Sequence, residues 1–144
     1  MTRRAELPVV AATMWLLASG CGDHFAQPAY HEALPGDYEI MAFAERQDMA
    51  IWRRDLPDGT TGRIPPTVCR VGWDNRFIIA AQHPRDPWDA PRPPPDKTVT
   101  NWYIIRMADD RVFGPFTESE YAAKRGELRV PDSISFTRVF DDLD

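Results

Sequence analysis

Residues that could perform chemistry are few in this chain of 144 residues, and they are scattered along it. It contains three histidines, His24, His31 and His83, and two cysteines, Cys21 and Cys69. Histidine is the side chain that most often supplies acid–base catalysis or a metal ligand. None of the three, however, has a second histidine or a cysteine at the spacing of a zinc motif. The pattern therefore predicts no catalytic residue, no metal ligand and no cofactor.

Other catalytic signatures are also missing from the sequence. Ser119 and Ser135 are not part of a Gly-x-Ser-x-Gly motif, and the glycines form no loop that could cradle a phosphate. The Asp109-Asp110 pair is typical of a turn, and the acidic residues 141–144 match no calcium loop. We therefore expect a protein that is not an enzyme, with a small envelope hydrolase that has an unrecognised site as the alternative.

Cys21 has the most specific chemical context in the chain. Arg3 and Arg4 precede an apolar run, 7–18, which has the length of a secretory signal and is shorter than the about 20 residues of a membrane-spanning helix. Residues 17–21 (Leu-Ala-Ser-Gly-Cys) resemble the lipobox of bacterial lipoproteins, which ends in Ala or Gly before the lipidated cysteine. We expect a signal peptide over residues 1–20 and lipidation of Cys21. Plain secretory cleavage and an uncleaved anchor are the alternatives.

A lipidated Cys21 would hold the protein on a membrane in the cell envelope, on the non-cytoplasmic side. A lipobox cysteine carries a diacylglyceryl group and usually a further acyl chain such as palmitate, and two or more chains make attachment stable. Gly22 stands where inner-membrane retention uses aspartate, which favours the outer membrane if the cell has two. The net charge is −5 without a basic stripe, so no nucleic-acid partner is expected. We expect a non-enzymatic binding or accessory module, such as an inhibitor, an immunity-like factor or an assembly factor, with an envelope protein or a glycan as its partner.

The residues after the signal divide into a tether and one domain. Residues 21–36 contain Pro28, Pro35 and Gly36 and show no hydrophobic periodicity, which indicates a flexible tether. Residues 37–144 are expected to form a single α+β domain, an antiparallel β-meander of about six or seven strands with one short C-terminal helix. The expected strands are 38–44, 49–53, 67–73, 76–82, 99–107, 112–113 and 135–140.

Two local patterns within this domain are especially clear. Asp-Asn at residues 74–75, between two apolar runs, predicts a two-residue hairpin turn. Thr117 and Glu120 form a capping box, which marks the start of a helix. Gly126 is placed to end that helix in a left-handed turn. The expected helix spans residues 118–125.

Residues 83–97 are rich in proline, which lacks the backbone N–H that a central strand needs. We expect an exposed loop, partly polyproline II in character, that carries Trp88. An exposed tryptophan rimmed by polar residues is typical of an interface anchor, so Trp88 is the candidate binding residue. The alternative is that Trp88 folds back over a sheet edge. Cys69 lies in a strand-like run, where a free cysteine is more often a small buried hydrophobe than a reactive thiol.

The ordered series of motifs resembles a family of small bacterial lipoproteins that carry a domain of unknown function. The series comprises the lipobox, residues 68–82 with Phe-Ile-Ile-Ala-Ala-Gln, residues 102–106 (Trp-Tyr-Ile-Ile-Arg), and Gly-Pro-Phe-Thr at 114–117 before a Glu-rich helix. The resemblance covers about residues 34–128 and implies no catalytic residue. The long proline insert departs from the family pattern. The Gly-Pro turn also resembles GYF-type adaptor modules, which bind proline-rich peptides through an aromatic pocket that the sequence does not locate.

Overall fold

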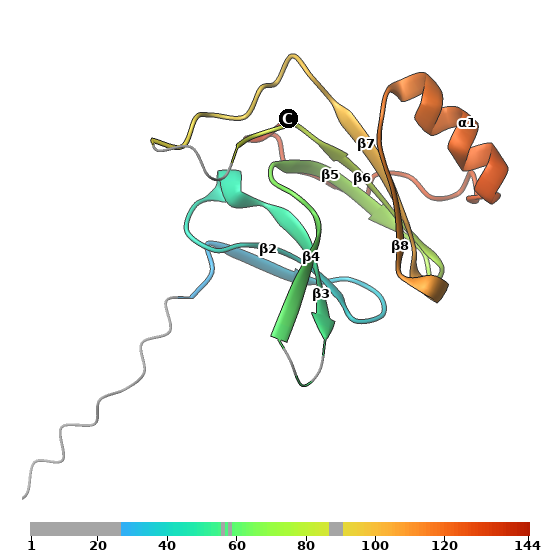
Figure 1. Ribbon diagram of the computed structural model, residues 1–144, viewed down its shortest axis with the longest axis horizontal. Helices are drawn as coiled ribbons and strands as arrows, with labels where there is room; N and C mark the ends of the chain where they lie inside the picture. Colours follow the sequence, from blue (N-terminus) through green and yellow to red (C-terminus); the bar gives the residue numbers. More distant parts are fainter. Residues whose placement is uncertain (1–26, 56, 58, 87–90) are drawn as a thin grey trace, which may run out of the picture.

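The computed structural model describes residues 27–55, 57, 59–86 and 91–144. Within this part, the strands form two antiparallel sheets, and one α-helix, α1 (Glu118–Leu128), lies near the C-terminal end (Figure 1). The first sheet has the strand order β1-β2-β3-β4, and the second has the order β8-β7-β6-β5-β9. This arrangement confirms the α+β meander predicted from the sequence. The predicted signal peptide, Cys21 and Trp88 lie outside the described residues.

The first four strands along the chain form the first sheet, and the next five form the second sheet. The strands of the first sheet are β1 (Tyr30–Ala33), β2 (Tyr38–Ala42), β3 (Ala50–Asp55) and β4 (Gly59–Ile64). Those of the second sheet are β5 (Val68–Trp73), β6 (Phe77–Gln82), β7 (Asn101–Arg106), β8 (Arg111–Phe116) and β9 (Arg138–Val139). Two short 3-10 helices, η1 (Arg46–Asp48) and η2 (Met107–Asp109), connect β2 to β3 and β7 to β8.

The two sheets pack face to face, and the main core lies between them. Ile40, Ile51 and Ile64 come from the first sheet, and Val71, Ile78 and Ile105 come from the second. A second apolar cluster lies on the opposite face of the second sheet, where Ile79 and Ile104 pack with Tyr121 of α1. Figure 1 shows α1 alongside β7 and β8. The helix therefore covers the outer face of the second sheet, and among the described residues no helix covers the outer face of the first sheet.

Two strands form where the sequence predicts none, and the described part has nine strands instead of six or seven. β1 falls inside the tether predicted for residues 21–36. It is held by the end of the chain, because Tyr30 packs edge-on against Phe140 with 5.3 Å between ring centroids. Glu32 also accepts hydrogen bonds from Arg138. β4 reads Gly-Thr-Thr-Gly-Arg-Ile, which has no apolar alternation, and it forms by pairing with β3.

The hairpin and the helix start are observed where the sequence predicts them, with differences at their ends. β5 and β6 pair antiparallel, but the turn between them is set by the Asp74 side chain, whose Oδ1 accepts from the N–H groups of Arg76 and Phe77, each at 2.7 Å. The capping box of Thr117 and Glu120 is present. The helix continues through Gly126 to Leu128, because Arg129 adopts the left-handed conformation in its place. The last predicted strand, 135–140, shortens to β9.

Candidate functional site

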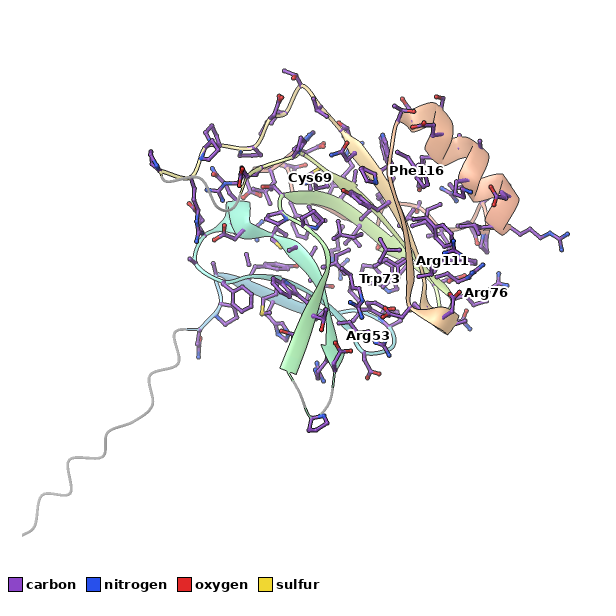
Figure 2. All side chains as sticks on the ribbon, in the orientation of Figure 1. Arg53, Cys69, Trp73, Arg76, Arg111 and Phe116 are labelled. Carbon is purple, nitrogen blue, oxygen red and sulfur yellow. The ribbon has the colours of Figure 1, made fainter. Side chains whose placement is uncertain are left out.

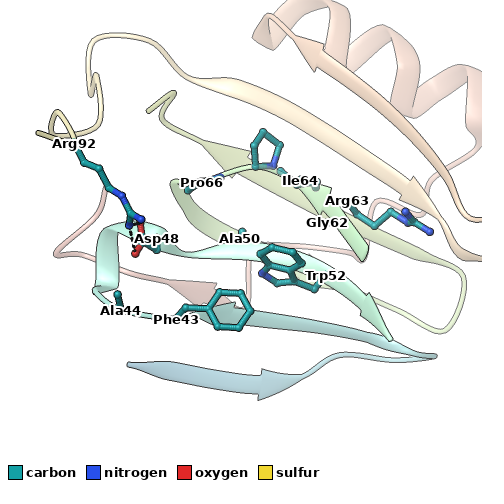
Figure 3. Close-up of a pocket in the computed structure, with 11 residues that line it drawn as sticks. Phe43, Ala44, Asp48, Ala50, Trp52, Gly62, Arg63, Ile64, Pro66 and Arg92 are labelled. Atoms are coloured by element: carbon teal, nitrogen blue, oxygen red, sulfur yellow. Dashed lines mark hydrogen bonds and ion pairs between the residues drawn. The ribbon is translucent and has the colours of Figure 1, made fainter. Parts of the chain in front are cut away.

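A groove of about 510 Å³ lies over the open outer face of the first sheet (Figure 3). Its volume falls within the range of about 300–1,000 Å³ that is typical of ligand pockets. Side chains alternate between the two faces of a strand. Ile51 therefore enters the core while its neighbours Ala50 and Trp52 line the groove. The walls are mostly apolar and come from β3, from β4 and from the segments that follow β2 and β4. The main apolar lining residues are Phe43, Ala50, Trp52, Ile64, Pro65 and Pro66.

An aromatic pair, the exposed Phe43 and the half-buried Trp52, forms the centre of this groove. Phe43 is 52% exposed, although it is a large hydrophobic residue. Its ring meets the ring of Trp52 edge to face, with 5.2 Å between centroids (Figure 3). Opposite Trp52, β4 carries a bulge, because Ile51 pairs with Ile64 and Trp52 with Gly62. The small Gly62 leaves the space beside the indole open to the groove.

The indole N–H of Trp52 has no partner among the described residues. Its Nε1 atom is buried, and no hydrogen bond to it is formed. Leaving a buried donor without an acceptor costs about 1–3 kcal/mol, so native structures seldom contain one without a reason. A ligand that brought an acceptor oxygen to Nε1 would recover this energy. Because Nε1 is buried beneath the groove surface, an acceptor can reach it only after the covering side chains shift.

The charged groups at one end of the groove are already paired with each other. Asp48 accepts from Arg92 at 3.0 Å and from Arg85 at 3.0 Å. The Arg85 side chain is only 2% exposed, and it also contacts Glu45 at 2.6 Å and donates to the Pro93 carbonyl at 2.7 Å. The described part of the proline-rich segment is thus fixed to η1 through the buried Arg85, while most of residues 91–97 are exposed. The buried arginine that fixes it gave no signal in the sequence.

The other end of the groove leads to a charge cluster around Asp110. Arg63 makes a two-pronged ion pair with this carboxylate, Arg53 contacts it at 2.7 Å, and Tyr38 donates to it at 2.5 Å. Burial alone would raise the pKa of Asp110, but the hydrogen bonds from Arg63, Tyr38 and Arg53 outweigh it and lower the pKa to about 2. Asp109, in contrast, binds Arg106 at the surface. The cluster joins both sheets, and within the described part of the chain it leaves no free carboxylate at this end of the groove.

A separate cluster of potential metal ligands lies at the other side of the main core. Cys69 of β5 (Figure 2), His83 after β6 and Asp144 bring one sulfur, nitrogen and oxygen atom within 4.8 Å of one another. Burial, followed by the nearby Asp144 carboxylate, raises the pKa of Cys69 to about 11, so its thiol is protonated. Its buried position agrees with the small hydrophobe that the sequence predicts. The sequence reveals no such cluster, because its members come from three distant segments.

The predicted site residues and the residues of the observed candidate sites do not coincide. Cys21 and Trp88 lie outside the described residues, whereas Phe43, Trp52 and the Cys69 cluster were not predicted as sites. Strand alternation puts Trp52 on a sheet face, but only the packing shows that this face is open. Among the described residues, no helix is long and apolar enough to span a membrane.

The family model described as "Protein of unknown function (DUF3997)" matches residues 35–141. The chain belongs to this family. The match confirms the predicted membership of a family built on a domain of unknown function, and it spans the strands β2 to β9 together with α1. No curated protein and no solved structure matches the chain.

Proposed function

We propose that this protein is a lipid-anchored, non-enzymatic binding module of the cell envelope. Its groove over β2–β4 holds an extended segment of a partner protein. The observation that carries the proposal is the aromatic pair of Phe43 and Trp52 together with the unpartnered indole N–H beside it. An apolar side chain of the partner fills the groove, and once the side chains over the indole move aside, a backbone carbonyl of the same segment accepts the Trp52 hydrogen bond.

The position of β4 favours an extended polypeptide as the occupant. β4 is an edge strand of its sheet, and residues 59–62 are exposed. An edge strand presents N–H and C=O groups that an incoming strand can pair with, which is a common way to bind peptides. Because β4 borders the groove, a segment added along it would direct alternate side chains toward Phe43 and Trp52. The main chain would then supply affinity and the groove would supply selectivity.

The same lining disfavours a glycan and a hydrolase reaction. A sugar carries many hydroxyl groups, and each needs a partner when it is buried. In the groove, Asp48 and Arg92 already bind each other, and Arg63 is bound to Asp110. Among the described residues, no serine, cysteine or histidine lines the groove, so these residues offer no obvious nucleophile or proton carrier. An apolar segment with one carbonyl matches what the groove offers.

The lipid anchor restricts where the partner is found. If Cys21 is lipidated, only residues 21–29 separate the anchor from β1, and such a link spans at most about 30 Å even when fully extended. The groove then stays close to the membrane surface. We infer that the partner segment belongs to a protein on or near the same membrane. Trp88, in the proline-rich segment that also supplies Arg92 to the groove, is a second candidate contact.

Affinity capture from gently cross-linked cell envelopes tests this proposal. The wild type is compared with Phe43→Ser and with Trp52→Phe, which keeps an aromatic ring but removes the N–H. Val139→Ser is the matched control, because Val139 is 45% exposed on β9, outside the groove. One envelope protein should be enriched by the wild type and Val139→Ser and lost with both groove variants. Equal capture by all four proteins, or capture of glycan alone, would contradict the proposal.

Cys21→Ala tests the anchor in the same experiment. The unlipidated protein should leave the membrane fraction and lose the partner, while Trp88→Ala reports whether the proline-rich segment contributes. Retention of Cys21→Ala on the membrane would show that residues other than Cys21 hold the protein there.

A further inference from the structure

The cluster of Cys69, His83 and Asp144 lies outside the groove and carries an inference of its own. Cys69 is fully buried, and the His83 side chain is only 6% exposed. The Asp144 side chain is 26% exposed, so the cluster reaches the surface on one side. One donor atom from each residue lies within 4.8 Å of the other two. The three donors are a thiol sulfur, an imidazole nitrogen and a carboxylate oxygen.

His83 is oriented as a metal-binding histidine is. Its Nδ1 lies 2.8 Å from the carbonyl oxygen of Val99. A carbonyl only accepts, so Nδ1 carries a proton, and in the neutral imidazole Nε2 is the atom with the free lone pair. Nε2 is buried and has no hydrogen-bond partner among the described residues, and its distance of 3.9 Å to Asp144 Oδ1 is too long for a hydrogen bond. Histidines that bind metals usually donate their other N–H to a carbonyl or carboxylate in this way.

The backbone also directs Cys69 toward this point. Val68 pairs with Gln82 and Arg70 pairs with Ala81, which leaves Cys69 as the extra residue of a β-bulge. Bulges redirect a side chain out of the regular alternation. Directly after the following strand, β6, His83 is held by two backbone hydrogen bonds to Thr67, each 2.9 Å long. The two donors therefore come from β5 and from the residue that follows its paired neighbour β6.

Asp144 is positioned by basic neighbours. Arg70 donates two hydrogen bonds to its carboxylate, at 2.9 and 2.6 Å, and Lys97 donates to its carbonyl oxygen at 2.8 Å. In a tetrahedral zinc site, a nitrogen and an oxygen ligand are about 3.4 Å apart. His83 Nε2 and Asp144 Oδ1, at 3.9 Å, need only a small side-chain rotation to reach this spacing.

We propose that Cys69, His83 and Asp144 bind one zinc-class divalent metal ion. Mixed sulfur, nitrogen and oxygen donors suit Zn²⁺ and its analogue Co²⁺ rather than Mg²⁺ or Ca²⁺, which take oxygen ligands. The ion links β5, the start of the proline-rich segment and the chain end, and water fills the remaining tetrahedral position. Because Cys69 and His83 are buried, the ion holds the fold together in this region and is independent of the groove.

Cobalt binding to the full chain tests the proposal, in a Cys21→Ala background that leaves Cys69 as the only thiol. The parent protein should bind one Co²⁺ per chain with a thiolate-to-cobalt charge-transfer band in the near ultraviolet, and Zn²⁺ should displace the cobalt and raise the Tm. Cys69→Ser should lose the band. His83→Gln and Asp144→Asn should weaken zinc binding at least tenfold in calorimetry.

His31→Gln is the matched control, because His31 binds Glu39 on the first sheet, away from the cluster. It should leave the band and the zinc affinity unchanged. Circular dichroism of each variant without metal checks that it folds, and Asp144→Asn, at a partly exposed position, gives the test if Cys69→Ser does not fold. Absence of the charge-transfer band in the folded parent, or equal zinc affinity in the parent and in Asp144→Asn, would overturn the proposal.

Discussion

Replacing Asp110 with asparagine should remove one of the strongest links between the two sheets. In the wild type, this carboxylate binds Arg63, Arg53 and Tyr38, and its side chain is 22% exposed. The pKa of Asp110 is lowered from its usual 3.8 to about 2 in the folded protein. The folded state therefore favours the ionised carboxylate more strongly than the unfolded chain does.

The size and the sign of the effect follow from this pKa. A shift of one pKa unit corresponds to about 1.4 kcal/mol, so the ionised carboxylate contributes about 2 kcal/mol to the free energy of unfolding at neutral pH. Because the pKa in the folded state is depressed, the contribution is fully present above pH 4. It is lost as the pH falls from about 4 toward 2. Asp110→Asn should therefore be about 2 kcal/mol less stable than the wild type at pH 7, and the difference should shrink as the solution is acidified.

Urea unfolding at a series of pH values from 7 to 2 measures this difference. Asp109→Asn is the matched control, because the adjacent Asp109 is exposed and binds only Arg106 through its side chain. It should change stability much less than Asp110→Asn at pH 7, and the two variants should converge as the pH approaches 2. A gap between the wild type and Asp110→Asn that is absent at pH 7, or that stays constant down to pH 2, would refute the reasoning.

Other substitutions should separate close packing, buried charge and capping in the same unfolding assay. Gly72→Ala places a Cβ 2.0 Å from the Ser135 carbonyl oxygen and should cost about 3 kcal/mol or prevent folding, whereas Gly126→Ala, in open space within α1, should stabilise by about 1 kcal/mol. Equal changes in the free energy of unfolding of the two glycine variants would contradict the close contact between Gly72 and Ser135. Arg85→Met removes a buried partner of Asp48 and should lower the free energy of unfolding by about 3 kcal/mol. An unchanged urea midpoint would contradict this role of Arg85. Thr117→Ala removes the helix cap and should lower the free energy of unfolding by about 1 kcal/mol. Unchanged stability of this variant would contradict a stabilising role of the cap.

The features that the sequence predicts well depend on residues that are close together in the chain. Thr117 and Glu120 are three positions apart and satisfy each other's backbone, so the capping box can be identified without any tertiary contact. The hairpin around Asp74 is equally local, because its turn is closed by hydrogen bonds to the next few residues. Even here, the predicted helix end is wrong, since Gly126 remains helical and Arg129 adopts the left-handed conformation that ends the helix.

The features that the sequence does not reveal depend on partners far away in the chain. β1 forms because Tyr30 and Glu32 meet Phe140 and Arg138, and no local pattern in the predicted tether indicates this pairing. The burial of Arg85 also depends on distant residues, since its acidic partners Glu45 and Asp48 lie about 40 positions earlier in the chain.

The candidate sites follow the same rule. Alternation alone places Trp52 on a sheet face, but the groove also needs Phe43, Pro65 and Arg92, which come from segments outside β3. The ligand cluster needs Cys69, His83 and Asp144 to meet across two strands and the chain end. Spacing rules for metal sites detect ligands that are near in sequence, so they do not detect this one.

The most direct test of the binding groove is site-specific photo-cross-linking in the producing cells. A benzoylphenylalanine is introduced in place of Phe43, which is 52% exposed in the groove, or in place of Val139, which is 45% exposed on β9. We expect irradiation to link one membrane-associated protein to position 43 and not to position 139. Trp52→Phe should weaken that cross-link. The same products from both positions, or a product from position 139 alone, would contradict the binding role of the groove.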